Sequence, residues 1–133
     1  MDRLRQRLSL AAQAVETLRE LALLPRPSRI ERDAAIQRFE YSFEATWKAA
    51  QRLLRLVEGV EAGSPKAAIR ASREAGLLDA AAAESALGMA DDRNLTAHTY
   101  NESLAVAIFA RLPRHLATLE AWLAAMATRL PSA

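Results

Sequence analysis

Cysteine is absent from this chain of 133 residues. That absence excludes a disulfide framework, a thiol nucleophile and a cysteine-ligated zinc site. Aromatic residues make up only 5% of the chain, and no apolar run reaches the roughly 18 residues that would span a membrane. The first ten residues, MDRLRQRLSL, lack the apolar core of a signal peptide, so we expect a cytoplasmic protein with no membrane partner.

Glycine and proline are scarce, with 4 and 5 residues, whereas the strong helix formers Ala, Leu, Arg and Glu are abundant. A chain of this length fits one compact domain. Charged residues make up 26% and hydrophobic residues 51%, a balance that excludes intrinsic disorder. We therefore predict a single all-α domain over residues 1–133.

Lysine is nearly absent, because Lys48 and Lys66 are the only two and the other basic residues are arginines. This bias fits either an arginine-rich genome or recognition of phosphate by planar guanidinium groups. The formal net charge of +2 does not decide between them. A dedicated nucleic-acid binder usually shows a concentrated basic patch. We expect most of these arginines to lie on the solvated surface.

Apolar residues at steps of three and four predict a first helix over residues 3–24. Asp2 is its expected N-cap, and Pro25 and Pro27 end it because proline removes a backbone donor. Its expected buried face consists of Leu4, Leu8, Ala11, Val15, Leu18 and Ala22.

A second helix should begin at Arg29, after a capping box formed by Ser28 and Glu31, and end near Gly59. One stripe of this helix collects most of the large side chains: Ile36, Phe39, Phe43, Trp47, Ala50, Leu54 and Val57. A ladder of charges is expected on its outer side, formed by Glu40, Glu44 and Lys48.

A short third helix is predicted over residues 65–75, with Ser64 as its cap and Gly76 as its stop. Asp79 caps a fourth helix that runs through an alanine run. Because a new helix starts soon afterwards, the fourth helix must fray or bend near residues 97–98. Its successive turns carry Leu87, Met89 or Ala90, Asn94 and Ala97.

Thr99 and Glu102 match a second capping box, so a last long helix should begin at about residue 100 and run to about residue 130. Pro113 is expected to kink it. Its apolar positions are Leu104, Ile108, Leu112, Leu116, Leu119, Leu123 and Leu130. Together these elements predict an up-and-down bundle of four long helices plus one short helix.

Most catalytic signatures are missing: GxGxxG, the Walker loop, GxSxG and HExxH do not occur. Two histidines seventeen residues apart do not form a metal site by spacing, and we predict neither a metal nor a cofactor. Polar and charged side chains that could take part in chemistry are instead concentrated in residues 91–102. That segment holds acids, an arginine, a histidine, a tyrosine and several amide or hydroxyl side chains.

On a straight helix Arg93 and Tyr100 would share one face, with His98 roughly 140° away from Arg93. A helix break, or a second subunit, could bring the three together. Arg93 could then hold a phosphate while His98 exchanges a proton near its free pKa of about 6.5.

The alternative to a functional cluster is that Arg93, His98 and Tyr100 each have a structural role. Arg93 could pair with Asp91 or with a carboxylate on another helix, His98 could cap a helix end, and Tyr100 could be a half-buried packing residue. His115 has no polar neighbours in sequence apart from Arg114, so we interpret it as a structural or surface residue.

The segment RNLTAHTY matches the pattern Rx4HxY and resembles the HEPN superfamily, more closely the nucleotidyltransferase substrate-binding proteins related to HepT toxins. Two further blocks occur in the order seen in that family: RFEYSFEATWKAA at residues 38–50 and SPKAAIRASREAGLL at residues 64–78. The third block, DDRNLTAHTYNE at residues 91–102, contains the motif itself.

The resemblance implies a homodimeric helical bundle encoded beside a minimal nucleotidyltransferase of the MNT class, the two acting as toxin and antitoxin. It implies that Arg93 and His98 form a metal-independent RNA-cleaving site. It also implies that Tyr100 is the residue to which the partner transfers AMP, which silences the toxin. Asp92 and Asn94 lie in the same block, next to Arg93, and would orient the motif.

Two functions remain in view on these grounds. The leading hypothesis is a dimeric ribonuclease that AMP transfer to Tyr100 inactivates. The alternative is a non-catalytic partner of the nucleotidyltransferase, which binds nucleotide or accepts the modification without cutting RNA.

Overall fold

The computed structural model describes residues 1–131, which contain five α-helices and no β-strand. The helices are α1 (Asp2–Ala22), α2 (Arg29–Leu53), α3 (Pro65–Glu74), α4 (Ala80–Leu95) and α5 (Glu102–Thr128). A π-helical turn, Leu54–Glu58, extends α2, and a 3-10 turn, Thr96–His98, extends α4. The predicted all-α class, with four long helices and one short one, is confirmed. Among these residues no helix combines the length and apolar character needed to cross a bilayer.

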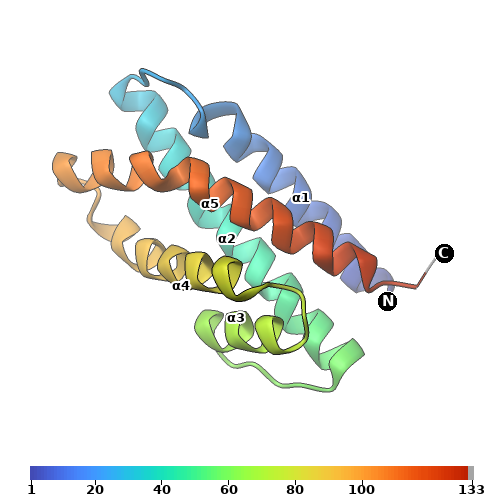
Figure 1. Cartoon of the computed structure of the whole chain (residues 1–133). Helices are drawn as coiled ribbons and strands as arrows, with labels where there is room; N and C mark the ends of the chain where they lie inside the picture. The colour runs from blue at the N-terminus through green and yellow to red at the C-terminus, as the bar shows by residue number, and fades with distance from the viewer. Residues whose placement is uncertain (132–133) are drawn as a thin grey trace.

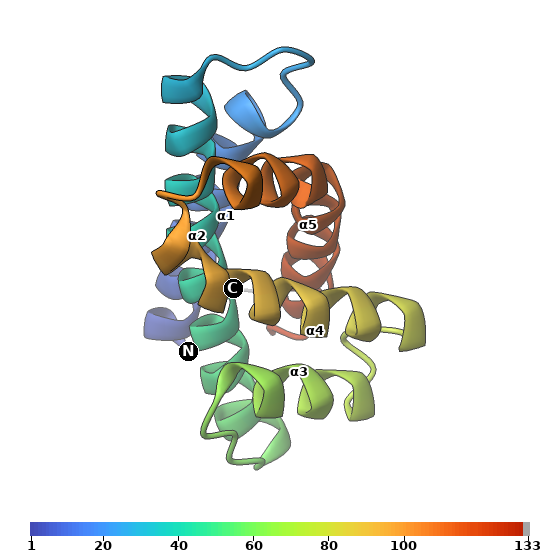
Figure 2. The same cartoon turned by 90° about the vertical axis from the view of Figure 1, so that its left-hand side faces the viewer.

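The helices α1, α2 and α5 pack along one another, and the four long helices alternate in direction along the chain (Figure 1). Figure 2 shows α3 and α4 turned across α1 and α2, so these two helices are splayed from the rest of the bundle. The start of α1 and the end of α5 lie at one end of the molecule, where the Arg5 guanidinium donates to the Pro131 carbonyl. The junction between α4 and α5 lies at the opposite end (Figure 1).

Helix α1 buries the six residues predicted from its spacing. The predicted cap is wrong, because Met1 occupies the N-cap position and Asp2 is already helical. The Met1 carbonyl accepts the first helical bond from the Arg5 amide at 2.9 Å, so the helix begins one residue earlier than expected.

Helix α2 starts at the predicted capping box: the Glu31 amide donates to Ser28 Oγ at 3.0 Å, and the Ser28 amide donates to a Glu31 carboxylate oxygen at 2.8 Å. Its apolar stripe is buried as far as Leu54, but Val57 is 37% exposed. The π-helical turn explains the difference, because its wider turn rotates later residues off the stripe. Gly59 then ends the element with a φ of 68°.

The caps of α3 and α4 are confirmed: Ser64 Oγ accepts from the Ala67 amide at 3.1 Å, and Asp79 accepts from the Ala82 amide at 2.7 Å. On α4 the buried residues are Ala83, Ala86, Met89, Ala90 and Asp92. Of the residues predicted on its successive turns, Met89 and Ala90 are buried, while Asn94 and Ala97 are exposed.

The predicted capping box at Thr99 is also wrong. Asn101 caps α5 and accepts from the Leu104 amide at 3.2 Å. The Thr99 hydroxyl instead donates to the Thr96 carbonyl at 3.1 Å, which closes the 3-10 turn. The predicted break near residues 97–98 is confirmed as this turn, and α5 therefore begins at Glu102.

Helix α5 contains Pro113 and bends between its first and second halves in both views (Figures 1 and 2). The bend follows from the missing proline amide. Five of the seven predicted apolar positions on α5 are buried, while Leu104 and Leu130 are half-buried. Trp122 is fully buried, and its indole N–H donates to Ser72 Oγ at 3.1 Å, which joins α5 to α3.

We predict that Trp122→Ala lowers the free energy of unfolding by about 3–5 kcal/mol, the range for a large aromatic side chain that leaves a cavity. Urea unfolding followed by circular dichroism measures the change. The exposed neighbour Ala124→Ser should change it by less than about 1 kcal/mol. A similar small change in both variants would contradict the packing described for Trp122.

Candidate functional site

The 3-10 turn between α4 and α5 presents His98 and Tyr100 to solvent. Tyr100 is 85% exposed, and its ring meets the His98 ring edge-on, with centroids 6.1 Å apart. Beneath them Thr96 is buried and its hydroxyl donates to the Arg93 carbonyl at 2.7 Å. The turn is therefore anchored through Thr96, Thr99 and Asn101 while its two functional side chains remain open.

Arg93 lies on the last turns of α4 and points toward α2. Its Nη1 donates to Thr96 Oγ1 at 3.3 Å, and its guanidinium lies 3.8 Å from a Glu40 oxygen and 3.7 Å from a Glu44 oxygen. The Arg93 Nε is buried and has no hydrogen-bond partner among the described residues. Arg93 thus faces carboxylates of another helix, one of the arrangements expected from the sequence, and keeps unused hydrogen-bonding capacity.

The charge ladder on α2 is only partly as predicted. Lys48 and Glu44 form the expected pair at 3.6 Å. Glu40 and Glu44, however, turn toward Arg93 of α4 instead of lying wholly on the outer side. The spacing placed them on one helix face but could not show that α4 covers that face.

A cavity of about 420 Å³ opens beside Arg93, between α2, the start of α3 and α4. Arg93 and Asn94 both line it, and Lys66 contributes a second cation from α3. Lys66 pairs with Asp91 at 2.6 Å, so Asp91 is not the partner of Arg93.

The helix break brings together only part of the motif. His98 and Tyr100 contact each other, whereas no hydrogen bond or ion pair within residues 1–131 joins Arg93 to His98. Arg93 is directed to α2, and the exposed pair projects from the turn. In a single copy of the chain the arginine and the histidine therefore contact different partners.

Asp92 lies on the other side of α4, against α5. It is 5% exposed, and its carboxylate accepts two hydrogen bonds from Arg111, both at 2.7 Å. His115 Nε2 lies 2.6 Å from the same carboxylate, and the imidazole stacks on Phe39 with centroids 5.1 Å apart. Asp92 therefore ties α4 to α5, and His115 extends the link to α2.

The prediction that His115 lacks a polar cluster is wrong, although the structural role assigned to it is consistent with its burial. Its partner Asp92 is 23 residues away in sequence, and Arg111 lies one helical turn before it on α5. Nothing local could indicate a contact that forms only when α4 packs on α5.

Burial and hydrogen bonding set the charges of this cluster. Burial alone would raise the pKa of Asp92, but the hydrogen bonds and charges of Arg111 and His115 outweigh it and hold that pKa below its ordinary value. Burial lowers the pKa of His115, and the Asp92 partner offsets only part of that effect. The neutral imidazole therefore donates its Nε2 proton to an ionised carboxylate.

A family model described as nucleotidyltransferase substrate binding protein like matches residues 6–128. The chain belongs to this family. A crystal structure of the protein ttk003001694 from Thermus thermophilus is similar, with 59% identity, a TM-score of 0.86 and coverage of 87% of this chain and 98% of that one. No curated protein matches.

A second solved structure, HI0074 from Haemophilus influenzae, has the same fold as our chain, with 22% identity and a TM-score of 0.76. The alignment covers 90% of this chain and 98% of that one. HI0074 is described as revealing the fold of a substrate binding domain of a nucleotidyltransferase.

In the described part of our chain, no three His, Asp or Glu side chains converge to hold a metal ion.

The Asp92 cluster predicts that acid destabilises the fold. Because the pKa of His115 is lower when folded, the unfolded chain takes up a proton first, and stability falls as the pH drops below about 6.5. Asp92, whose pKa is also lowered on folding, adds a further loss below about 3.8.

His115→Gln removes the titrating group but keeps an N–H donor. Between about pH 7.5 and about pH 5, the midpoint of urea unfolding should therefore shift less in this variant than in the wild type. The control is His98→Gln at the exposed histidine, which should retain the wild-type shift. Equal shifts in all three proteins would contradict the role given to His115.

Proposed function

We propose that this chain is the partner of a minimal nucleotidyltransferase and that Tyr100 accepts a nucleotidyl group from it. The exposure of the Tyr100 side chain, 85%, carries this proposal. The other tyrosine, Tyr41, is 42% exposed, and its hydroxyl lies 2.6 Å from the Thr17 hydroxyl. Membership of the nucleotidyltransferase substrate-binding family supports the partner class.

The reaction joins the Tyr100 phenol oxygen to the α-phosphorus of ATP. The bond from that phosphorus to the bridging oxygen breaks, pyrophosphate leaves, and the phenol proton passes to a base. The product is a phosphodiester between tyrosine and AMP. His98, whose ring meets the Tyr100 ring edge-on, is our candidate for that base.

Incubation with the nucleotidyltransferase and ATP should add the mass of AMP to a peptide containing Tyr100. Tyr100→Phe should abolish this label, because phenylalanine lacks the attacking oxygen. Tyr41→Phe is the matched control and should be labelled as well as the wild type. Mass spectrometry of peptides locates the group, and undiminished labelling of Tyr100→Phe would refute the acceptor assignment.

The second proposed activity is metal-independent cleavage of RNA by a homodimer, as in HEPN toxins. Arg93 and His98 contact different partners in one copy, and a two-fold interface would supply both residues twice, which favours this activity. The Arg93 guanidinium is partly exposed and lines the cavity beside α2, where it could contact a phosphate oxygen. Asn94 lines the cavity beside Arg93. Asp92, on the opposite side of α4, would position the motif by holding α4 against α5 through Arg111.

In this reaction one histidine removes the proton of the ribose 2′-hydroxyl, whose oxygen attacks the adjacent phosphorus. The other histidine protonates the leaving 5′-oxygen, and the arginines stabilise the developing negative charge. AMP on Tyr100 would place a phosphate and a base beside His98. Such a modification would silence the ribonuclease, which gives the pair its toxin and antitoxin character.

Cleavage of RNA in EDTA should fall by about a hundredfold or more in either Arg93→Gln or His98→Gln. Arg70→Gln, at an exposed arginine on α3, is the control and should cleave like the wild type. Mixing the two inactive variants should restore part of the activity if the sites are shared between copies. Wild-type protein that accepts AMP but leaves RNA intact would instead establish the non-catalytic partner.

A further inference from the structure

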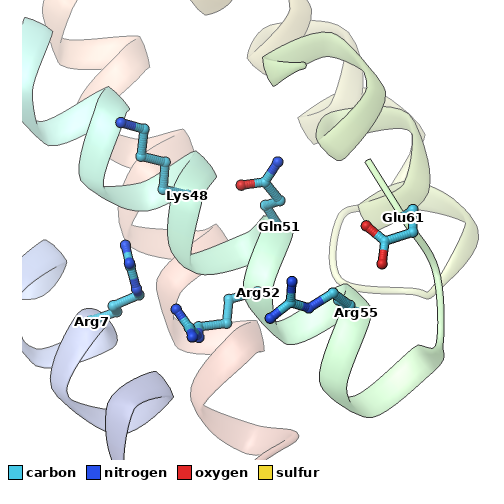
Figure 3. A pocket seen from close by; sticks show the side chains of 6 residues that line it. All are labelled: Arg7, Lys48, Gln51, Arg52, Arg55 and Glu61. Atoms are coloured by element: carbon cyan, nitrogen blue, oxygen red, sulfur yellow. The ribbon is translucent and has the colours of Figure 1, made fainter. Parts of the chain in front are cut away.

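A second polar site lies between α1 and the end of α2, away from the motif. It is a pocket of about 390 Å³. Six residues line it: Arg7, Lys48, Gln51, Arg52, Arg55 and Glu61. Figure 3 shows the Arg52 guanidinium extending from α2 toward α1, which carries Arg7, while Glu61 approaches from the loop after α2. We call these six residues the cationic pocket.

Positive charge in the cationic pocket is poorly compensated. Four of its six residues are basic and one is acidic. Within residues 1–131, Arg7, Arg52 and Arg55 form no ion pair, and only Lys48 has a carboxylate partner, Glu44. Like charges gathered in this way repel one another, so a fold that retains them gains when an anion is bound.

Arg52 is the residue most affected. It is half-buried, and its Nε is enclosed without a hydrogen-bond partner. Burial lowers its pKa, and the neighbouring charges of Arg7 and Arg55 lower it further. A half-buried guanidinium that lies among other cations and has no carboxylate partner within residues 1–131 is suited to a phosphate, which accepts two parallel hydrogen bonds from arginine.

We propose that the cationic pocket binds the polyphosphate chain of a nucleotide. Its basic groups converge on one hollow from α1 and α2, which suits several phosphates joined directly to one another. None of the six lining residues is aromatic, whereas proteins that track single-stranded nucleic acid stack bases on aromatic side chains. The site therefore fits a nucleoside triphosphate better than an RNA strand.

A hydrogen bond fixes one wall of the pocket to α2. The Gln51 amide donates to the Ala62 carbonyl at 2.6 Å, which holds the loop of residues 59–63 against α2 and positions Glu61 at one side. Glu61 is the single carboxylate in the lining and is placed to receive a donor from a ribose hydroxyl.

The cationic pocket is separate from the motif but shares a helix with it. Glu44, which faces Arg93, precedes Arg52 by eight residues, about 12 Å along α2. Lys48 lies between them and pairs with Glu44. The proposal concerns ligand binding by the free chain, so it stands or falls independently of whether Tyr100 is modified.

Isothermal titration of the purified chain with inorganic triphosphate, ATP and AMP tests the proposal. Triphosphate and ATP should bind, and AMP should bind at least about tenfold more weakly because it offers one phosphate. Arg52→Gln and, on exposed α1 surface, Arg7→Gln should each weaken ATP binding by about tenfold. Arg26→Gln removes the same charge from the loop before α2 and should leave binding within about twofold.

Thermal unfolding of each variant without ligand shows that a loss of binding is not a loss of fold. An RNA oligonucleotide without a 5′-triphosphate provides the competing ligand. Binding of this RNA through Arg52 without binding of triphosphate would overturn the assignment. Equal weakening by Arg26→Gln and Arg52→Gln, or no binding of triphosphate by the wild type, would also overturn it.

Discussion

The Asp92 carboxylate is the interaction on which the site depends. It is buried between α4 and α5, and both hydrogen bonds from Arg111 and the contact with His115 end on it. The turn that carries His98 and Tyr100 joins those two helices. Without this carboxylate the buried His115 would lose the acceptor of its Nε2 proton, a larger cost than the loss of an exposed ion pair.

A single helix, α2, organises the charged surface of the molecule. Its middle presents Glu40 and Glu44 to Arg93, and its last turns present Lys48, Arg52 and Arg55 to α1. The carboxylates balance the arginine of the motif, while the cations at the end of the helix remain mostly unpaired. The carboxylates that face Arg93 and the cationic pocket thus lie on one helix, with opposite charge at its two parts.

Features that depend on neighbouring residues could be predicted from the sequence. The apolar stripe of α1 and the caps at Ser28, Ser64 and Asp79 follow from spacing and side-chain chemistry, and the structure confirms them. The predicted cap of α5 is wrong because both Thr99 and Asn101 can cap a helix, and only the 3-10 turn decides between them.

Features that depend on packing could not be predicted. The contact of Asp92 with His115, the approach of Glu40 to Arg93 and the meeting of Arg7 with Arg52 all join separate helices. We expected most of the arginines to lie separately on the solvated surface, but three of them, Arg7, Arg52 and Arg55, line one pocket. The polar segment at residues 91–102 was visible in the sequence, but its division into an inward Arg93 and an outward Tyr100 required the structure.

The most direct test measures the rate of AMP incorporation at Tyr100 in Asp92→Ala, at a temperature where circular dichroism shows the variant folded. Tyr100 and His98 are untouched by this change, so only their presentation is altered. The account predicts a clearly slower rate than in the wild type, because the junction of α4 and α5 loses its anchor. A rate equal to that of the wild type would contradict it.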